Sequence, residues 1–144
     1  MKTILLLVSM LFVHLTASAN PFASPEAFIK EFDCILGRGV ADYALSWYSA
    51  APLSKEINTE KAIHAIAVLR KFDMDYGNVL EIKVLEKRTI AESSTIVYLA
   101  VVHERGSVFY FVKLSEDGQG WLLTEFRFNS NPDQILPVRL LNKK

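Results

Sequence analysis

The sequence is poor in cysteine and carries no net charge, and both features narrow its possible roles. Its 144 residues include one Cys, which excludes a disulfide within the chain and a cysteine-rich zinc site. Lys and Arg number 16, as do Asp and Glu, so the formal net charge is zero. That balance argues against a surface for nucleic acid or for an anionic membrane. With 51% hydrophobic and 22% charged residues, the composition indicates one folded domain.

Long apolar runs are also scarce, and the longest lies at the N-terminus. Residues 4–13 form an apolar run behind Lys2, and the triplet Ala-Ser-Ala that follows suits a signal peptidase. The run is shorter than the roughly 20 residues that span a bilayer. We therefore predict a signal peptide over residues 1–19, cleaved after Ala19. The remaining chain, 20–144, is expected to be a single exported domain, periplasmic or secreted, with no membrane contact after cleavage.

The single cysteine is expected to be structural. Cys34 lies between Phe32 and Ile35 on a predicted helix, and Asp33 beside it would oppose a thiolate. We therefore expect Cys34 to be a buried, small apolar residue and not a nucleophile.

The first half of the mature chain has the spacing of three helices. Ser24 and Pro25 form a helix start, and apolar residues then recur at helical spacing up to residue 36. Further helices are predicted over residues 40–49 and 60–72, the last packing through Ile63, Ile66 and Leu69. Tyr43, Trp47 and Tyr48 on the middle helix are candidate ligand-binding residues, although helix-to-sheet packing predicts the same residue types.

The second half changes to the pattern of β-strands. Runs rich in β-branched and aromatic residues occupy 79–85, 95–103, 108–114 and 121–128. Short connections, including the turn signal Asp117-Gly118, make them antiparallel neighbours. The fold class is therefore α+β, with three N-terminal helices packed on a curved, cone-like meander of four strands.

Both faces of this predicted sheet are largely apolar, and one set of helices can cover only one face. The simplest cover for the outer face is a second copy of the chain, so we predict a homodimer through it. The alternative is a β-bulge that shifts the register midway, which would make neither face as apolar as counted.

One polar cluster follows from the simplest register. Pairing Glu116 with Gln119 places four residues on one face in adjacent rows. They are His103, Tyr110, Glu125 and Arg127, with Tyr110 also a candidate ligand contact. Such residues can exchange protons and hold an oxyanion, so they are the candidate catalytic set. A solvated Glu125–Arg127 ion pair is the alternative, and a register shift of one residue would scatter the four.

Metal and cofactor sites are not indicated. His64 has no His or acidic residue four positions away, and Asp73 and Asp75 lack the other oxygen ligands of a calcium loop. No phosphate-binding glycine loop or metalloprotease motif is present. We therefore expect neither a metal nor a cofactor.

Several local features together resemble the nuclear-transport-factor-2-like superfamily of cystatin-like α+β cones, which includes the SnoaL-like cyclases. They are Ala27-Phe28, then Gly39, Tyr43 and Trp47, and the closing strand 120–128. The resemblance covers nearly all of the mature chain and is to small exported bacterial members. It implies a cavity between helices and sheet, and dimerisation through the outer sheet face. It carries over no catalytic residue.

Three functions stay open on the sequence. The first is a non-catalytic module that binds a small apolar ligand or an exported protein partner. The second is an isomerase- or lyase-like enzyme working in the cone cavity. The third is a structural accessory protein or one of the inhibitor or immunity type. The lack of a convincing catalytic set favours binding over catalysis.

Overall fold

The structure, a computed structural model, describes residues 22–44 and 59–142. The predicted signal peptide and the candidate residues Trp47 and Tyr48 lie outside the described residues. Within the described ranges, no helix is long and apolar enough to cross a membrane.

The N-terminal helix forms where its capping residues predict it. In α1 (Pro25–Glu31) the Ser24 hydroxyl accepts the Ala27 N–H at 3.1 Å, and a 3₁₀ helix, η1 (Phe32–Ile35), continues the turn. Gly37, with φ of +72°, ends this segment because a positive φ costs glycine little. Cys34 is exposed, so its predicted burial is wrong: the buried stripe is Phe28, Phe32 and Ile35.

Residues 41–44 are helical and fall within the second predicted helix. The third helix is longer than the range 60–72 that its apolar spacing predicted. Helix α3 spans Thr59–Tyr76 and ends at Gly77, whose φ is +80° and whose N–H bonds the Asp73 carbonyl. Leu69 is fully buried, but Ile63 is 63% exposed, so the predicted core role of Ile63 is wrong.

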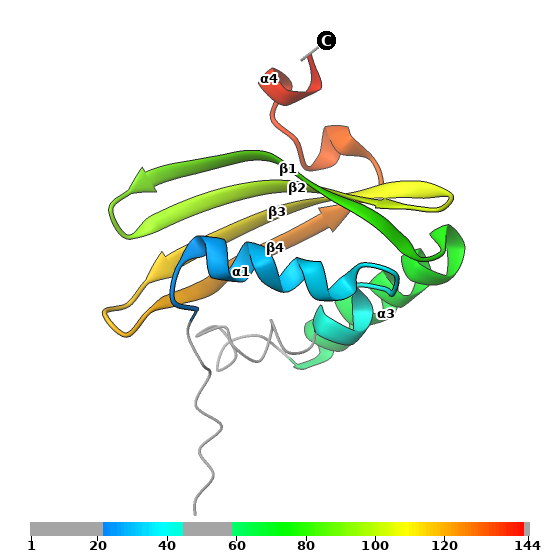
Figure 1. The fold of residues 1–144 in the computed structure, drawn as a ribbon, viewed down its shortest axis with the longest axis horizontal. Coiled ribbons are helices and arrows are strands. Elements are labelled where there is room, and N and C mark those ends of the chain that lie inside the picture. The colour runs from blue at the N-terminus through cyan, green and yellow to red at the C-terminus, as the bar shows by residue number, and fades with distance from the viewer. Residues whose placement is uncertain (1–21, 45–58, 143–144) are drawn as a thin grey trace, which may run out of the picture.

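The four strands form one antiparallel meander in the order β1-β2-β3-β4, which confirms the α+β fold class. Strand β1 has three register irregularities along its pairing with β2, and it bends over the helices (Figure 1). The curvature of the cone therefore begins in β1. The strand bounds are Val79–Ala91 for β1, Ser94–His103 for β2, Gly106–Glu116 for β3 and Trp121–Asn129 for β4.

The register between β3 and β4 differs from the predicted one. Glu116 pairs with Trp121 across a four-residue turn, and a bulge at Thr124 then shifts the pairing by one residue. Because side chains alternate between faces, one extra residue reverses the face of all residues beyond it. Tyr110 accordingly pairs with Phe128 instead of Glu125, and Phe126 and Phe128 turn toward the helices.

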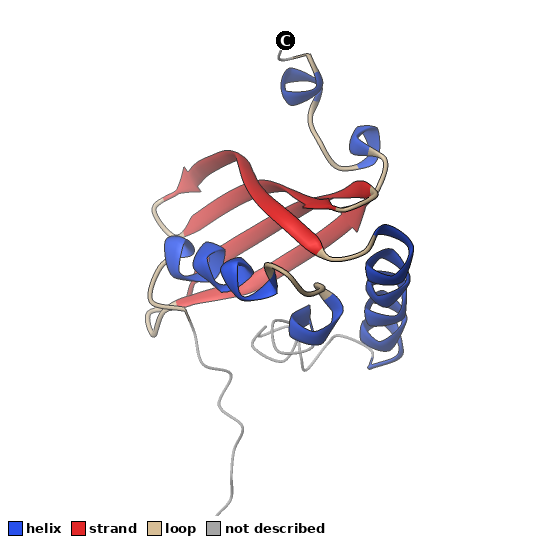
Figure 2. Ribbon diagram, turned by 45° about the vertical axis from the view of Figure 1, so that its right-hand side comes forward, coloured by secondary structure: helices blue, strands red, loops and turns tan. Residues whose placement is uncertain are grey.

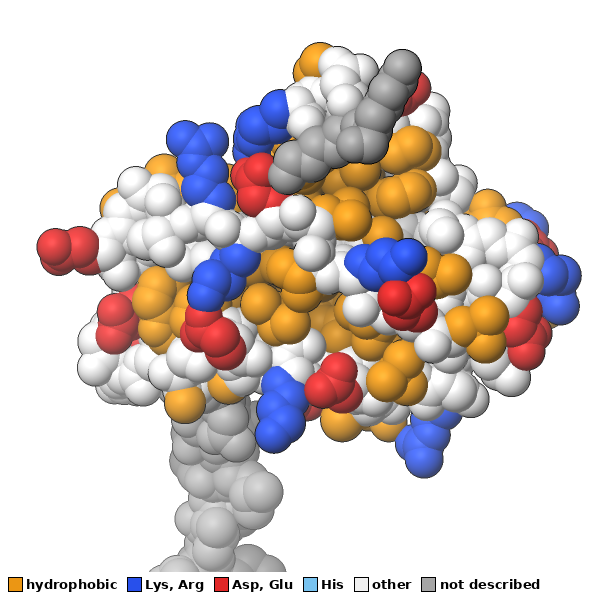
Figure 3. All heavy atoms as spheres, turned by 45° about the horizontal axis from the view of Figure 1, so that its top comes forward, with side chains coloured by type: hydrophobic (Ala, Val, Ile, Leu, Met, Phe, Trp, Pro, Cys, Tyr) orange, Lys and Arg blue, Asp and Glu red, His pale blue; other side chains and the backbone are white. Residues whose placement is uncertain are grey.

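The two faces of the sheet are covered by different parts of the chain. The inner face, with Val97, Leu99 and Tyr110, packs against α1, η1 and α3 (Figures 1 and 2). The C-terminal segment, with η3 (Pro132–Gln134) and α4 (Val138–Leu141), starts at β4 and reaches Glu86 of β1 through Arg139. It therefore lies over part of the outer face, and hydrophobic side chains remain visible beside it (Figure 3).

Candidate functional site

The predicted acid–base cluster does not assemble. The bulge at Thr124 places Glu125 opposite Lys113 and Arg127 opposite Phe111, on the outer face. The Arg127 Nε lies 2.9 Å from a Glu125 carboxylate oxygen, and its guanidinium stacks 4.2 Å over the Phe111 ring. The prediction that these two residues share a face with His103 and Tyr110 is therefore wrong, and they form a surface ion pair.

His103 and Tyr110 lie on the inner face, within the packed core. His103 is 3% exposed, and its Nδ1 lies 2.8 Å from the Gly77 carbonyl oxygen at the end of α3. Tyr110 is fully buried among the rings of Phe32, Phe126 and Phe128. Neither residue is among those that line a described pocket. Both side chains therefore contribute to the packing of the core.

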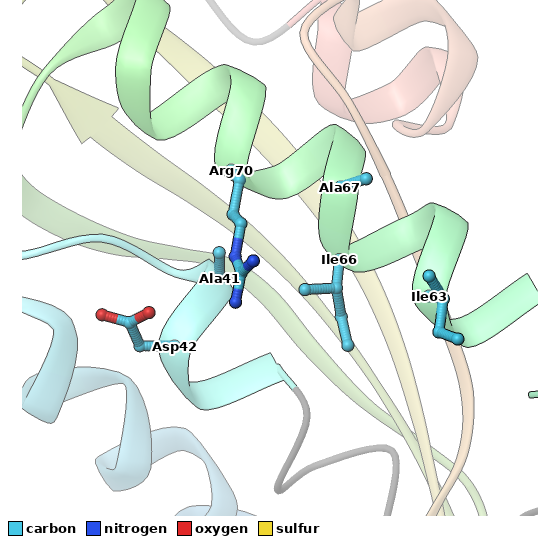
Figure 4. A pocket seen from close by; sticks show the side chains of 6 residues that line it. All are labelled: Ala41, Asp42, Ile63, Ile66, Ala67 and Arg70. Carbon is cyan, nitrogen blue, oxygen red and sulfur yellow. The ribbon is translucent and has the colours of Figure 1, made fainter.

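A pocket of about 500 Å³ opens between α3 and residues 41–44 (Figure 4). Its size falls in the range of small-molecule sites, and its lining is mainly aliphatic. The described residues that line it are Ala41, Asp42, Ile63, Ile66, Ala67 and Arg70.

The wall of the pocket follows from the periodicity of α3. Ile63, Ile66, Ala67 and Arg70 have the spacing i, i+3, i+4, i+7, so they form one stripe along the helix. A second stripe of the same helix, with Leu69, Phe72 and Tyr76, packs on the body of the protein. The first stripe is thus left facing the pocket.

The opposite wall of the pocket is held in place by two hydrogen bonds to a residue of α3. The Asp73 carboxylate on α3 accepts the backbone N–H groups of Val40 and Ala41, each at 3.0 Å. These N–H groups stand at the start of the helical turn 41–44, where free donors are expected. Asp73 therefore fixes Ala41 and Asp42 beside the α3 stripe. The sequence analysis considered Asp73 only as a possible calcium ligand.

Two charged side chains stand in the pocket wall. Neither Arg70 nor Asp42 makes an ion pair or side-chain hydrogen bond with any of the described residues. The Arg70 guanidinium extends from α3 toward Ala41, whereas the Asp42 carboxylate is turned away from it (Figure 4). The pocket therefore combines an aliphatic surface with an available cation.

Tyr43, a predicted ligand contact within the described residues, does not line the pocket. The Tyr43 hydroxyl accepts a hydrogen bond from the Arg38 Nη1 at 2.9 Å. The sequence analysis missed Arg70 and Ala67. The signal that could have found them is the spacing of the stripe on α3, in which apolar residues are followed by the cationic Arg70. Among the described residues, no cluster of His, Cys, Asp or Glu is placed to hold a metal ion.

Helices packed on the inner face of a bent antiparallel meander define the nuclear-transport-factor-2-like (NTF2-like) class of fold. A crystal structure from Campylobacter jejuni, described as an NTF2-like transpeptidase, has this fold with a TM-score of 0.53. The two chains are 22% identical, and the match covers 70% of this chain and 97% of that one. This likeness confirms the resemblance at the level of the fold. Comparisons with models of known families and with curated sequences gave no match.

Proposed function

We propose that the protein is a non-catalytic binding module that holds a small, mainly apolar ligand beside α3. The observation that carries this proposal is the pocket of about 500 Å³ with Ile63, Ile66 and Ala67 along one wall. Apolar lining with few polar groups is typical of small-molecule sites. Burial of a ligand's apolar surface there supplies the driving force at about 25 cal/mol per Å².

The separation of the candidate catalytic groups supports binding over the isomerase or lyase alternative. Glu125 and Arg127 lie on the outer face, while His103 and Tyr110 are buried on the inner face. General acid–base catalysis needs its groups within hydrogen-bond reach of one substrate. A pocket that contains none of these four residues among its described lining favours retention of a ligand without chemistry.

Native mass spectrometry of protein purified from its own host tests the binding role. We expect a retained small molecule in the wild-type protein and its loss in Ala67→Leu, which places a larger side chain in the pocket. Ala67 is exposed, so the substitution leaves the core unaltered. The matched control is His64→Leu, on the same helix, at an exposed residue that is not among the described lining of the pocket. If the Ala67→Leu variant retained the ligand as fully as the His64→Leu variant, the proposal that the ligand binds in this pocket would be wrong.

We further propose a homodimer through the outer face of the sheet. Phe109 and Tyr98 lie on that face and are only half-buried, and Val138 of the neighbouring α4 is 70% exposed. Figure 3 shows hydrophobic side chains over this face, bordered by charged ones. Apolar patches with a polar rim are typical of protein interfaces.

Sedimentation velocity tests the dimer. We expect Phe109→Glu to give a monomer because it buries a charge in the proposed interface. The control is Met74→Glu, the same kind of substitution at a 78% exposed residue of α3. A wild-type protein that sediments as a monomer at micromolar concentration would refute the dimer.

Export is the last part of the proposal. It is supported by the apolar run and small-residue triplet within residues 1–19. N-terminal sequencing of the protein from its host should find Asn20 as the first residue. A mature protein that still begins at Met1 would exclude cleavage.

A further inference from the structure

We infer that the ligand of the α3 pocket is an amphipathic carboxylate whose head group is bound by Arg70. This inference rests on the proposed binding function and adds the chemical class of the ligand. Three observations carry it: the order of residues along α3, the lack of an acidic partner for Arg70 among the described residues, and the orientation of Asp42.

The order of residues along α3 matches an amphipathic molecule. Ile63 and Ile66 provide aliphatic surface at the N-terminal end of the stripe, and Arg70 follows one turn after Ile66. Residues four apart on a helix are neighbours on its surface. A ligand that lies along the stripe can therefore bury an alkyl or aromatic portion against the isoleucines while its polar end meets the guanidinium.

The charge of Arg70 is available to a ligand because none of the described acidic residues neutralises it. The adjacent Lys71 shows the contrast, since its ammonium lies 2.7 Å from the Asp75 carboxylate. Asp73, three residues beyond Arg70, is occupied by the N–H groups of Val40 and Ala41. A guanidinium offers paired N–H donors that match the two oxygens of a carboxylate.

Asp42 is the acidic residue among the described residues of the pocket lining, and its position bears on the sign of the ligand charge. Its carboxylate points away from the Arg70 guanidinium (Figure 4), so Asp42 does not pair with the charge of Arg70. An anionic head group is therefore favoured at Arg70. A cationic head group at Asp42 is the competing outcome, and the experiment below includes it.

Three probes with one alkyl chain separate these cases: decanoate, decanol and decylammonium, each titrated below its micelle concentration and followed by isothermal calorimetry. We expect the wild-type protein to bind decanoate about fivefold more tightly than decanol. This is the ratio of affinities that one partly exposed ion pair produces. Decylammonium should bind most weakly. Raising the salt concentration should reduce the advantage of decanoate because the charges are screened.

Two variants assign the effect to Arg70. Arg70→Gln should abolish the preference for decanoate over decanol. Lys71→Gln removes the same charge from the next residue of the same helix, and it should keep the preference. Both side chains are exposed, so neither substitution touches the core.

The possible failures are distinguishable. Equal binding of decanoate and decanol by the wild-type protein, or tighter binding of decylammonium, would overturn the carboxylate inference while the proposed binding function stands. A preference that Lys71→Gln abolishes as completely as Arg70→Gln would overturn the role of Arg70. If none of the three probes binds, the proposed function itself fails for ligands of this kind.

Discussion

The Asp73 carboxylate and the backbone N–H of Val40 lie 3.0 Å apart, although 33 residues separate them in the chain. The second carboxylate oxygen accepts the Ala41 N–H at the same distance. Gly39 stands so close that a Cβ atom there would lie 2.4 Å from an Asp73 oxygen. One side chain of α3 therefore positions the start of the helical turn that forms the other wall of the pocket.

Replacing Asp73 by Ala should lower the free energy of unfolding by about 2 kcal/mol, the upper range for a lost helix N-cap, because two N–H groups lose their acceptor. Urea unfolding followed by circular dichroism measures this. The control is Asp75→Ala, an exposed carboxylate paired with Lys71 on the surface, which should have a smaller effect. Equal losses for the two variants would contradict the capping role of Asp73.

Gly39→Ala should destabilise the protein only while Asp73 is present. The added methyl group would displace the carboxylate from its two N–H donors, whereas Gly39 has no positive φ that would itself disfavour alanine. In the Asp73→Ala background the same substitution should therefore cost little. A double-mutant cycle of urea unfolding energies measures this coupling, since residues in contact are not additive. Additive effects within about 0.3 kcal/mol would argue against the close approach.

The fold was predictable from the sequence because its signals are local and repeated. Ser24 and Pro25 mark the start of α1, and the change from helical to alternating spacing after Gly77 marks the sheet. The inner stripe of α3 was less clear, since Ile63 is as apolar as Leu69 but faces the pocket. Periodicity shows that a stripe exists, but it does not show which neighbour covers it.

The predicted arrangement of the site was wrong because β4 contains one extra residue, Thr124, in its pairing with β3. In β4 the inward-facing apolar residues are Trp121 and Leu123 before the bulge, and Phe126 and Phe128 after it. The change from odd to even positions was visible in the sequence, with the polar pair Thr124-Glu125 at the point of change. Pairing two strands outward from a turn assumes that no residue is extra, and a bulge breaks that assumption.

Thr124→Val should weaken this bulge. The Thr124 hydroxyl donates to the Lys113 carbonyl at 3.2 Å and lies 3.3 Å from the Ser115 hydroxyl, across the strand pair. Valine has nearly the same shape without these bonds, so we expect a loss of about 1 kcal/mol in urea unfolding. Thr89→Val is the matched control, since Thr89 lies exposed in β1 and its hydroxyl makes no bond with the described residues. A loss that the control shares would contradict a role for the hydroxyl.

Glu26 of α1 and Lys87 of β1 form an ion pair that ties the N-terminal helix to the sheet. The hydrogen bond from the Lys87 ammonium holds the pKa of the Glu26 carboxyl below its usual value. A carboxyl whose pKa is lower in the folded state stabilises that state above the unfolded pKa, and this contribution is lost as the pH falls.

Glu26→Gln should therefore lower the urea midpoint at pH 7 and have little effect well below about pH 4, where the wild-type carboxyl is itself protonated in the unfolded chain and increasingly in the folded one. Added salt should reduce the difference at pH 7, because both side chains are exposed. Glu31→Gln, on the same helix and without an ion pair among the described residues, should show no such pH dependence. If the effect of Glu26→Gln were the same at pH 3 and pH 7, the ion pair with Lys87 could not be its cause.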